Sequence, residues 1–427
     1  MARFLLLTGA AAGHVNPVMQ IARKLVGRGH EVVWITGRRY QEKVESTGAR
    51  FHPFPAESDP GMMEIYEFFP EYGKLKGLAQ TKYMFKHMCI DRCPGMLETI
   101  DTVLADFPAD VLVGDTVVWA PYVKSLMGGP PSAMIFLTPL ALSSRDTAPY
   151  GLGILPGNTL VTRARDRLLN FIADRILLRD VTIYLNNAFR EWGLPPVKGP
   201  FFPAVFEIPA LVMQLSTSAF EYPRSDLPKH IHYIGPVLPE PTPSFQPPMW
   251  WPDLSCSETV VLVNQGTIAM NLDDLVVPTI KALKDQQMLV VAVPVAEGKL
   301  GDLPDHVRAE PFIPFDQLLP HVDVMVSNGG YGGTQFALAH GIPVVLAGET
   351  EDKMEVAARV EWAGAGINLR KQHPSPQEIR DAVKELLTNP IYGENARRIQ
   401  ADFAKYDAPT KAAELLESLI GLVPEPG

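Results

Sequence analysis

Ser327-Asn328-Gly329-Gly330-Tyr331-Gly332-Gly333-Thr334-Gln335-Phe336-Ala337-Leu338 is the stretch from which the chain can be interpreted. It follows the apolar run 322–326, which is typical of a buried strand, and it opens a helix expected to end near Gly341. Four glycines within five residues let the backbone approach a ligand and present N–H groups at the positive end of a helix dipole. The pattern predicts an anion site, with phosphate as the expected anion. A glycine-rich turn that only packs a helix against a sheet is the alternative.

Size and charge limit the classes of protein to consider. The 427 residues suit about two domains, and 46% hydrophobic with 20% charged residues is typical of a globular protein. The formal net charge of −10 argues against a nucleic-acid partner, which needs a basic face. One phosphorylated small molecule remains compatible, because backbone amides can hold an anion.

The cysteines and the N-terminus indicate a compartment. Cys89, Cys93 and Cys256 are too few for a disulfide framework, so a reducing, cytoplasmic location is expected. His87 beside Cys89 and Cys93 leaves zinc as the alternative to buried thiols. The stretch 4–12 weakly resembles a signal peptide but is more typical of a buried first strand, and no apolar run reaches the ~18–20 residues of a membrane span.

The first half alternates strands and helices. A strand over 4–8, a small-residue loop, a helix starting at Asn16-Pro17 and a strand over 31–36 form a βαβ unit. Strand patterns recur at 110–115 and 133–137. Such units predict a parallel sheet with right-handed crossovers, which we assign to a domain spanning residues 1–236.

A proline-rich segment separates the two halves. Residues 237–257 lack an apolar period and are expected to form a stiff, exposed linker. Strand patterns then return at 259–263, 289–293, 309–312, 322–326 and 344–347, in a second domain over 258–408. A last helix and tail, 409–427, are expected to return to the first domain. The fold class is α/β, with two Rossmann-like doubly wound domains that bind ligand where the carboxyl ends of their strands face each other across a cleft.

Methionine and aromatic side chains are concentrated between residues 60 and 100. Such richness indicates either helix core or an adaptable wall for an apolar ligand. The candidates for an acceptor pocket are Met62, Tyr66, Phe69, Tyr83, Met84 and, on a later strand, Phe136. Residues 138–160 are expected to be a long loop, and long loops within compact domains are often functional.

Three segments together resemble a known family: Gly13-His14-Val15-Asn16-Pro17, Tyr233-Ile234-Gly235-Pro236, and the segment 312–353. They are similar to the inverting, nucleotide-sugar-dependent glycosyltransferases of the GT-B fold, the superfamily of UDP-glycosyltransferases and bacterial macrolide glycosyltransferases. The similarity covers nearly the whole chain, although 60–100 and 138–230 match only in general character. It implies transfer of a hexose from a UDP- or dTDP-sugar to a hydroxyl of a lipophilic or phenolic small molecule, by a monomer or homodimer without any further cofactor.

Such a transfer needs a base, because a hydroxyl is a poor nucleophile until its proton is removed. A histidine suits this role near neutral pH if a carboxylate orients it and stabilises the imidazolium. His14 follows the first strand, and Asp115 ends another parallel strand at the same sheet edge. The resemblance makes His14 the base and Asp115 its partner, whereas on its own a loop histidine is more often an ordinary surface residue.

The resemblance also assigns a donor site. It gives the diphosphate to Gly266, Thr267 and the loop containing Gly329, Gly330, Gly332, Gly333 and Thr334. Phe312 would stack on the base, and the Ile313 backbone would bond its edge. Asp352 would bind sugar hydroxyls; a solvated acid at a helix N-terminus is the alternative. No metal is expected, because the helix N-terminus would take the leaving charge.

Three residues depart from the family pattern. Asn328 replaces a histidine that donates to phosphate, and it can donate only as a neutral group. Phe336 replaces a glutamate that grips the ribose hydroxyls, which leaves dTDP-sugars open beside UDP-sugars. Lys353 replaces a glutamine after the acid, which affects which sugar is preferred.

Other functions remain as alternatives. A nucleotide-sugar epimerase or hydrolase would use the same fold without an acceptor pocket. A catalytically silent helper protein would have no need of both His14 and Asp115. An NAD-dependent dehydrogenase is disfavoured, because the loop 9–14 lacks the G-x-G-x-x-G spacing.

Overall fold

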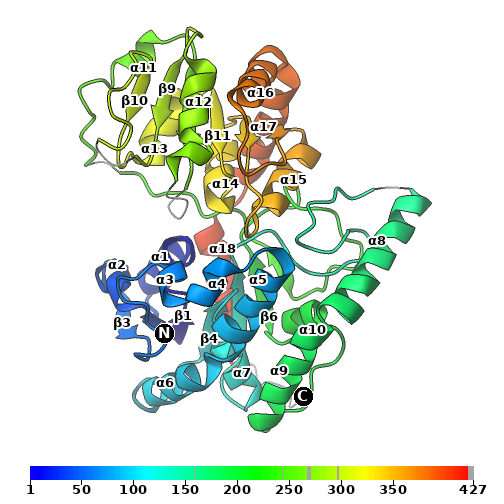
Figure 1. Cartoon of the computed structure of the whole chain (residues 1–427). Helices are drawn as coiled ribbons and strands as arrows, with labels where there is room; N and C mark the ends of the chain where they lie inside the picture. The colour runs from blue at the N-terminus through cyan, green and yellow to red at the C-terminus, as the bar shows by residue number, and fades with distance from the viewer. Residues whose placement is uncertain (158, 243, 267–270, 296–297, 422–427) are drawn as a thin grey trace.

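The computed structural model describes residues 1–157, 159–242, 244–266, 271–295 and 298–421. Figure 1 shows two lobes, each built on a parallel sheet with helices on both faces. The predicted α/β fold class with two Rossmann-like domains is confirmed.

The first sheet has seven parallel strands in the order β3-β2-β1-β4-β5-β6-β7. Alternate side chains of β1 enter different cores: Leu5 and Leu7 pack on one face, Phe4 and Leu6 on the other. Because both faces are covered, the strands are nearly continuous apolar runs. The strands are β1 (Arg3–Leu7), β2 (Glu31–Thr36), β3 (Arg50–Pro53), β4 (Val111–Asp115), β5 (Ser132–Phe136), β6 (Leu211–Gln214) and β7 (Ile231–Tyr233).

Helices cover both faces of this sheet. One face carries α1, against which the last helix of the chain, α18, packs with Ala412 and Leu416 buried in the shared core. The helices and helical turns of this half are α1 (Ala12–Gly27), η1 (Arg38–Tyr40), α2 (Gln41–Glu45), α3 (Ile65–Phe68), α4 (Pro70–Lys74), α5 (Gly77–Tyr83), η2 (Met84–Ile90), α6 (Cys93–Asp106), α7 (Ala120–Leu126), α8 (Leu160–Ile172), η3 (Ala173–Leu177), α9 (Arg179–Glu191) and α10 (Phe201–Glu207), with α18 at Ala408–Glu417.

The second sheet has six parallel strands in the order β10-β9-β8-β11-β12-β13. Its strands are β8 (Val260–Asn264), β9 (Leu289–Ala292), β10 (Val307–Ala309), β11 (Val324–Ser327), β12 (Val344–Leu346) and β13 (Gly366–Asn368). Its helices and turns are α11 (Asp253–Cys256), η4 (Leu272–Asp274), α12 (Val276–Leu283), α13 (Phe315–Leu318), η5 (Leu319–His321), α14 (Tyr331–Ala339), α15 (Lys353–Ala363), α16 (Pro376–Thr388) and α17 (Pro390–Phe403).

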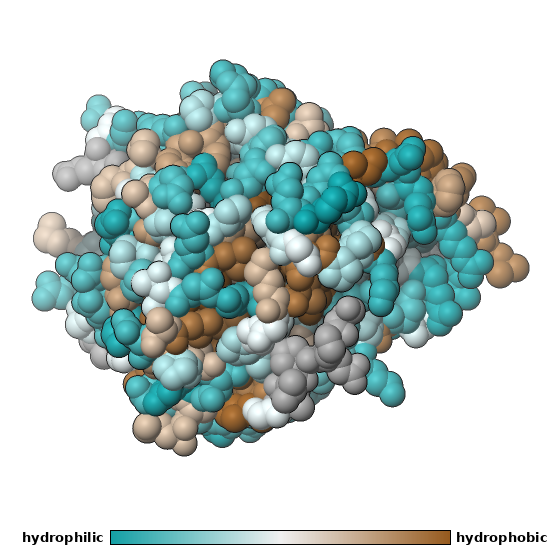
Figure 2. Space-filling model, turned by 90° about the horizontal axis from the view of Figure 1, so that it is seen from below, coloured by the Kyte–Doolittle hydropathy of each residue, from teal (hydrophilic) through white to brown (hydrophobic). Residues whose placement is uncertain are grey.

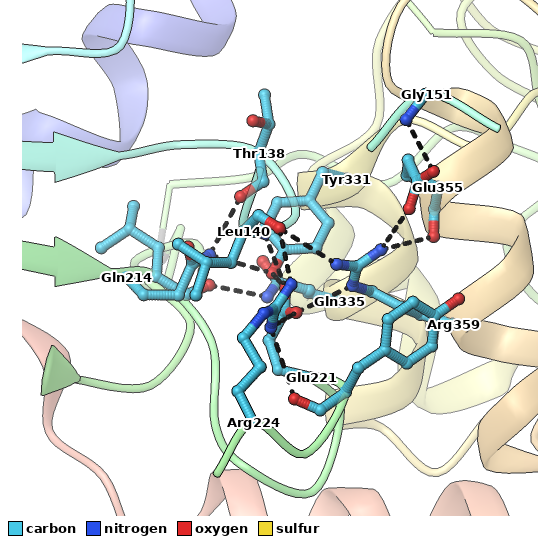
Figure 3. Close-up of polar contacts among 12 residues, drawn as sticks. Thr138, Leu140, Gly151, Gln214, Glu221, Arg224, Tyr331, Gln335, Glu355 and Arg359 are labelled. Atoms are coloured by element: carbon cyan, nitrogen blue, oxygen red, sulfur yellow. Dashed lines mark hydrogen bonds and ion pairs between the residues drawn. The ribbon is translucent and has the colours of Figure 1, made fainter. Parts of the chain in front are cut away.

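A buried ion network joins the two halves (Figure 3). Arg359 on α15 is 1% exposed, and its guanidinium donates to Glu221 of the first half and to Glu355, each at 2.9 Å. Glu355 also accepts the backbone N–H groups of Gly151 and Gly153 at 2.8 and 2.9 Å, which ties the loop containing these two glycines to α15. Breaking one partner of such a buried network typically costs about 3–5 kcal/mol, so this contact strongly constrains how the lobes sit.

Three details differ from expectation. Helix α1 begins at Ala12 rather than at Asn16, so Pro17 lies inside it; the proline is tolerated near the first turns, where it removes one hydrogen bond, to the Gly13 carbonyl. The strand expected at 309–312 is β10 and ends at Ala309, because Pro311 cannot donate to a ladder. The segment 237–257 is not uniformly exposed, since Trp250 and Trp251 pack on the second core.

The structure shows Cys89 and Cys93 as buried thiols and the N-terminal stretch as a buried strand. Cys89 and Cys93 are buried free thiols, Cys256 is an exposed one, and residues 3–7 form the buried strand β1. Within the described ranges, no group of three or more His, Cys, Asp or Glu side chains could hold a metal ion. A search of the same ranges finds no helix that is both long enough and apolar enough to cross a membrane.

Candidate active site

The order of strands reverses at one place in each sheet, between β1 and β4 in the first and between β8 and β11 in the second. In open parallel sheets, ligands bind beyond the carboxyl ends of the strands at such a reversal, because the loops there diverge to opposite faces. His14 follows β1 and Asp115 ends β4; Gly266 follows β8 and Asn328 follows β11. The topology therefore gathers the predicted residues at two switch points.

At the first switch point, His14 and Asp115 form a direct pair. The His14 Nδ1 lies 2.7 Å from the Asp115 Oδ2. The Asp115 side chain is fully buried, whereas that of His14 is 24% exposed. An ionised carboxylate at this distance places the proton on Nδ1 and leaves the Nε2 lone pair free. Among the described residues, none hydrogen-bonds to that Nε2.

Backbone donors hold Asp115 in place. Its Oδ2 also accepts the N–H of Gly9 at 2.7 Å, and its Oδ1 accepts those of Val117 and Val118 at 2.9 and 3.0 Å. A side chain at Gly9 would collide with Val117 and crowd His14, so the small-residue loop after β1 makes this packing possible.

The pair shifts both pKa values. Burial opposes the charged form of His14, but the charge of Asp115 and the hydrogen bond to it raise the pKa of His14 above its ordinary value. Burial likewise opposes ionisation of Asp115, and the His14 contact with the backbone hydrogen bonds lowers the Asp115 pKa nevertheless. The result is a strengthened base beside a carboxylate that stays charged.

Asp352, in the second half, interacts electrostatically with His14. It precedes α15, and its charge is among those that raise the pKa of His14. Burial, reinforced by Glu351, raises the pKa of Asp352 to about 6. Asp352 is half-buried, so its carboxylate is less exposed than that of a fully solvated acid at a helix N-terminus. The neighbouring Lys353 is buried and donates to Thr350 and Glu351, each at 2.8 Å.

At the second switch point, glycines allow two loops to meet closely. Gly266 and Gly329 have φ angles of +77° and +88°, a left-handed conformation that favours glycine. The Asn328 side chain donates to the Gln265 carbonyl and so joins the loop after β8 to the loop after β11. Helix α14 starts after Gly330 with no side chain capping its N-terminus, which leaves its dipole open to an anion.

Further donor-site candidates lie around this loop. Thr334 is buried, and within the described chain its Oγ1 has no hydrogen-bond partner. Phe312 is 73% exposed, so its ring face is available for stacking, while Ile313 is buried in the core. Gly332 and Gly333 lie in the first turn of α14. Thr267 lies outside the described residues.

The acceptor candidates do not form one group. Phe69 and Tyr83 line a cavity of about 310 Å³, which does not include His14. Tyr66 reaches the second half, its hydroxyl donating to Glu351 at 3.5 Å. Met62 is 84% exposed, whereas Met84 packs against the first core. Phe136 is buried in that core against Phe206, so the structure places it in packing rather than on a ligand-facing wall.

Several residues that join the two halves were not predicted from the sequence. Tyr331, within the glycine loop, points its hydroxyl away from solvent to Glu221 at 3.4 Å, and Gln335 donates to the Leu215 carbonyl at 2.7 Å. Both belong to contacts more than a hundred residues apart in sequence, and no local pattern signals them. The buried charge of Glu221, Glu355 and Arg359 carries no sequence signature either.

Two family models match the chain. The N-terminal domain of glycosyltransferase family 28 matches residues 4–109, and the C-terminal domain of the erythromycin biosynthesis protein CIII-like family matches residues 278–419.

Individual relatives match at full length. The chain is 40% identical to 4'-demethylrebeccamycin synthase of Lentzea aerocolonigenes, over 98% of this chain and 100% of that protein. It is 35% identical to UDP-glycosyltransferase 2 of Phaeomoniella chlamydospora, over 95% and 93%.

Solved structures share the fold. CalG4, the calicheamicin glycosyltransferase, superposes with a TM-score of 0.74 at 22% identity over 100% of both chains. The glycosyltransferase VinC in complex with dTDP superposes with a TM-score of 0.67 at 19% identity, over 98% of this chain and 99% of that one. Because relatives are 35–40% identical over nearly their full length and the solved structures share the architecture, the chain belongs to the GT-B glycosyltransferases of the natural-product and UDP-glycosyltransferase type.

Proposed function

We propose that this glycosyltransferase moves a hexose from a UDP- or dTDP-sugar to a hydroxyl group of a lipophilic or phenolic small molecule, with inversion at the anomeric carbon. The observation that carries the proposal is the 2.7 Å contact between His14 and buried Asp115, with the Asp352 carboxylate acting on the same histidine from the other half. A base and a sugar-binding acid thus come from opposite lobes.

His14 acts as the general base. The acceptor hydroxyl gives its proton to Nε2 as its oxygen bonds to the anomeric carbon, and the bond from that carbon to the diphosphate breaks on the opposite face. Asp115 stays ionised and stabilises the imidazolium, which the lowered pKa of Asp115 and the raised pKa of His14 both support.

The second switch point holds the donor. The uncapped start of α14 and the orphaned Oγ1 of Thr334 are suited to diphosphate oxygens, and exposed Phe312 is suited to stacking on the base. We infer that backbone amides take the leaving charge without a divalent metal. Gly266, Thr267, Gly330, Gly332 and Gly333 complete the proposed cradle, with Ile313 offering its backbone and Asn328, Asp352 and Lys353 at the sugar end.

The lobes divide these tasks. We propose that residues 1–236 form the acceptor-binding domain, 258–408 the donor-binding domain, 237–257 the linker and 409–427 a returning helix and tail. Tyr66 is the best-placed acceptor candidate, because its contact with Glu351 brings it beside Asp352. Met62, with its exposed side chain, could cover an apolar acceptor from the same segment.

The test uses His14→Ala, assayed for transfer from UDP- and dTDP-hexoses to a panel of phenolic and lipophilic acceptors. Turnover should fall at least about 10³-fold, while calorimetry with UDP and dTDP in metal-free buffer should give an unchanged Kd. The matched control is His30→Ala, because His30 makes an equally short 2.7 Å pair with Glu417 far from either switch point. Undiminished turnover in His14→Ala would falsify the base assignment. If neither nucleotide binds the wild-type protein, the donor site is wrong.

A further inference from the structure

Helix α8 and the turn η3 that follows it expose large apolar side chains, while a charged side chain of α8 is buried. The one fully buried residue of α8 is an aspartate, Asp166, whereas Leu160, Leu168 and Phe171 are 84%, 60% and 59% exposed. Their spacing of eight and three residues, bridged by Ala164, puts them on one side of the helix. We call the exposed apolar set the α8 face: Leu160, Val161, Leu168, Phe171, Ile176 and Leu177.

The α8 face lies at the periphery of the molecule. In Figure 1, α8 projects from the first lobe away from both sheets. Figure 2 shows brown apolar side chains beside teal ones on the protrusion at the right. Several large apolar side chains exposed on one projecting helix, interspersed with arginines, indicate an interaction site.

Cations flank this face. Residues 159–180 contain five arginines against three aspartates, in a chain whose formal net charge is −10. The aspartates are already engaged: Asp166 pairs with Arg165, Asp174 accepts from Ser143, and Asp180 pairs with two lysines. The local surface is therefore basic as well as apolar.

A hollow beside α8 concentrates this charge. Its volume is about 510 Å³, and its lining includes Trp362 and three arginines, Arg145, Arg163 and Arg167, against one carboxylate, Asp146, which accepts hydrogen bonds from Ser225. In the described part of the chain, none of the three guanidinium groups lies within 4 Å of a carboxylate oxygen; the Arg145 guanidinium donates from Nε to Ser225, and its backbone N–H donates to Asp226. Three arginines against one carboxylate leave an excess of positive charge in the hollow, which is suited to a phosphate group.

The exposed apolar residues and the arginines together indicate which partner fits the α8 face. A nucleic acid has no need of exposed Leu and Phe. A second copy of this chain, apposed through the same face, would bring arginines against arginines while its aspartates remain engaged. An anionic membrane surface matches both properties, because a helix of this type lies in the interface with its apolar side chains at the acyl boundary and its cations at the headgroups.

We propose that the α8 face docks on a bilayer rich in anionic lipids, with the arginine hollow taking one headgroup phosphate. This inference stands apart from the sugar transfer and involves none of the residues assigned to it. It places the protein at a lipid surface without inserting a spanning segment.

The test is co-sedimentation with unilamellar vesicles of phosphatidylcholine, with and without about one quarter phosphatidylglycerol. The wild-type protein should sediment with the anionic vesicles, and added salt should weaken the binding. Arg163→Gln with Arg167→Gln should lower the partition coefficient about thirtyfold, since each arginine near an anionic surface contributes about a factor of five. Leu168→Glu with Phe171→Glu should abolish sedimentation.

The control is Met249→Glu with Ile391→Glu, which adds the same negative charge at exposed apolar residues outside the α8 face. It should lower vesicle binding only by the amount that follows from the change in net charge. Circular dichroism melting checks that every variant is folded. Equal binding by Leu168→Glu/Phe171→Glu and the control, equal binding to neutral vesicles, or no binding by the wild-type protein would each overturn the proposal. So would a wild-type dimer that the same double variant dissociates without any vesicle binding, because the face would then join two copies.

Discussion

The two switch points of this molecule share a topology and differ in chemistry. Between β1 and β4, the loops carry a titratable pair, His14 and Asp115, locked by backbone donors. Between β8 and β11, the loops carry glycines with positive φ angles and the uncharged Asn328, whose side chain donates to the Gln265 carbonyl. We propose that the first site moves a proton and that the second holds an anion through backbone amide dipoles. On this proposal, the order of the strands sets where ligands bind, and the loops set which chemistry takes place there.

The largest expected effect comes from removing the charge at the first switch point. In Asp115→Asn the amide cannot stabilise an imidazolium, so kcat should fall about 10³-fold or more. The variant should also lose about 1–3 kcal/mol of stability, because an NH₂ group would face the donors from Gly9 or Val117. Steady-state kinetics and urea unfolding measure both effects.

The control for this variant is Asp110→Asn, because Asp110 precedes β4 and accepts the Arg3 N–H at the opposite end of that strand. It should leave kcat unchanged. Loss of UDP or dTDP binding in Asp115→Asn would contradict the separation of the two sites.

Strain in the loop at the second switch point should weaken nucleotide binding rather than proton transfer. Gly329→Ala forces a side chain into φ +88° and places its Cβ about 3.5 Å from Lys353, so nucleotide Kd should rise about thirtyfold. Gly29→Ala is the matched control, with φ +85° and open space around its Cβ, after α1. Calorimetry that finds the same Kd in both variants would remove Gly329 from the donor site.

The pH profile tests how the two halves combine. His14 must be neutral to accept a proton and Asp352 must be ionised to accept sugar hydroxyls, so both forms are lost as pH falls. Protonation of His14 alone should lower kcat/KM about tenfold for each unit by which the pH falls below the His14 pKa. Because the pKa of Asp352 is about 6, the decrease should become steeper below about pH 6. Asp352→Asn should retain only the shallower limb; an unchanged profile would exclude Asp352 from the reaction.

The smallest expected effect concerns donor choice. Phe336 now packs edge-on against Phe315, with ring centroids 6.3 Å apart. Phe336→Glu should raise the preference for uridine over deoxythymidine donors about fivefold, the value of one hydrogen bond to a ribose hydroxyl. Phe336→Ala removes the ring without adding the carboxylate and should leave the ratio of kcat/KM values unaltered, so an equal shift in both would contradict the hydrogen-bond explanation.

Much of the fold was readable from local patterns. The strands at 31–36 and 289–293 are observed within one residue, because continuous apolar runs between polar turns have few other uses. The strands β3, β6, β7 and β13 were missed; β3, β7 and β13 contain no continuous apolar run that would signal a strand. The start of α1 was misplaced because Asn16-Pro17 has the chemistry of a helix start although the chain already turns at Ala11.

The candidate site divides in the same way. The sequence by itself determined the glycine loop, the helix behind it and the presence of His14 and Asp115 at the ends of parallel strands, because these depend on residue type and spacing over a few residues. Only the tertiary structure decided that His14 and Asp115 lie 2.7 Å apart, that Asp352 of the other half acts on the same histidine, and that Arg359 joins Glu221 to Glu355. Contacts between residues a hundred or more positions apart follow from strand order and from the burial of charge, and neither property is written in any local stretch of the chain.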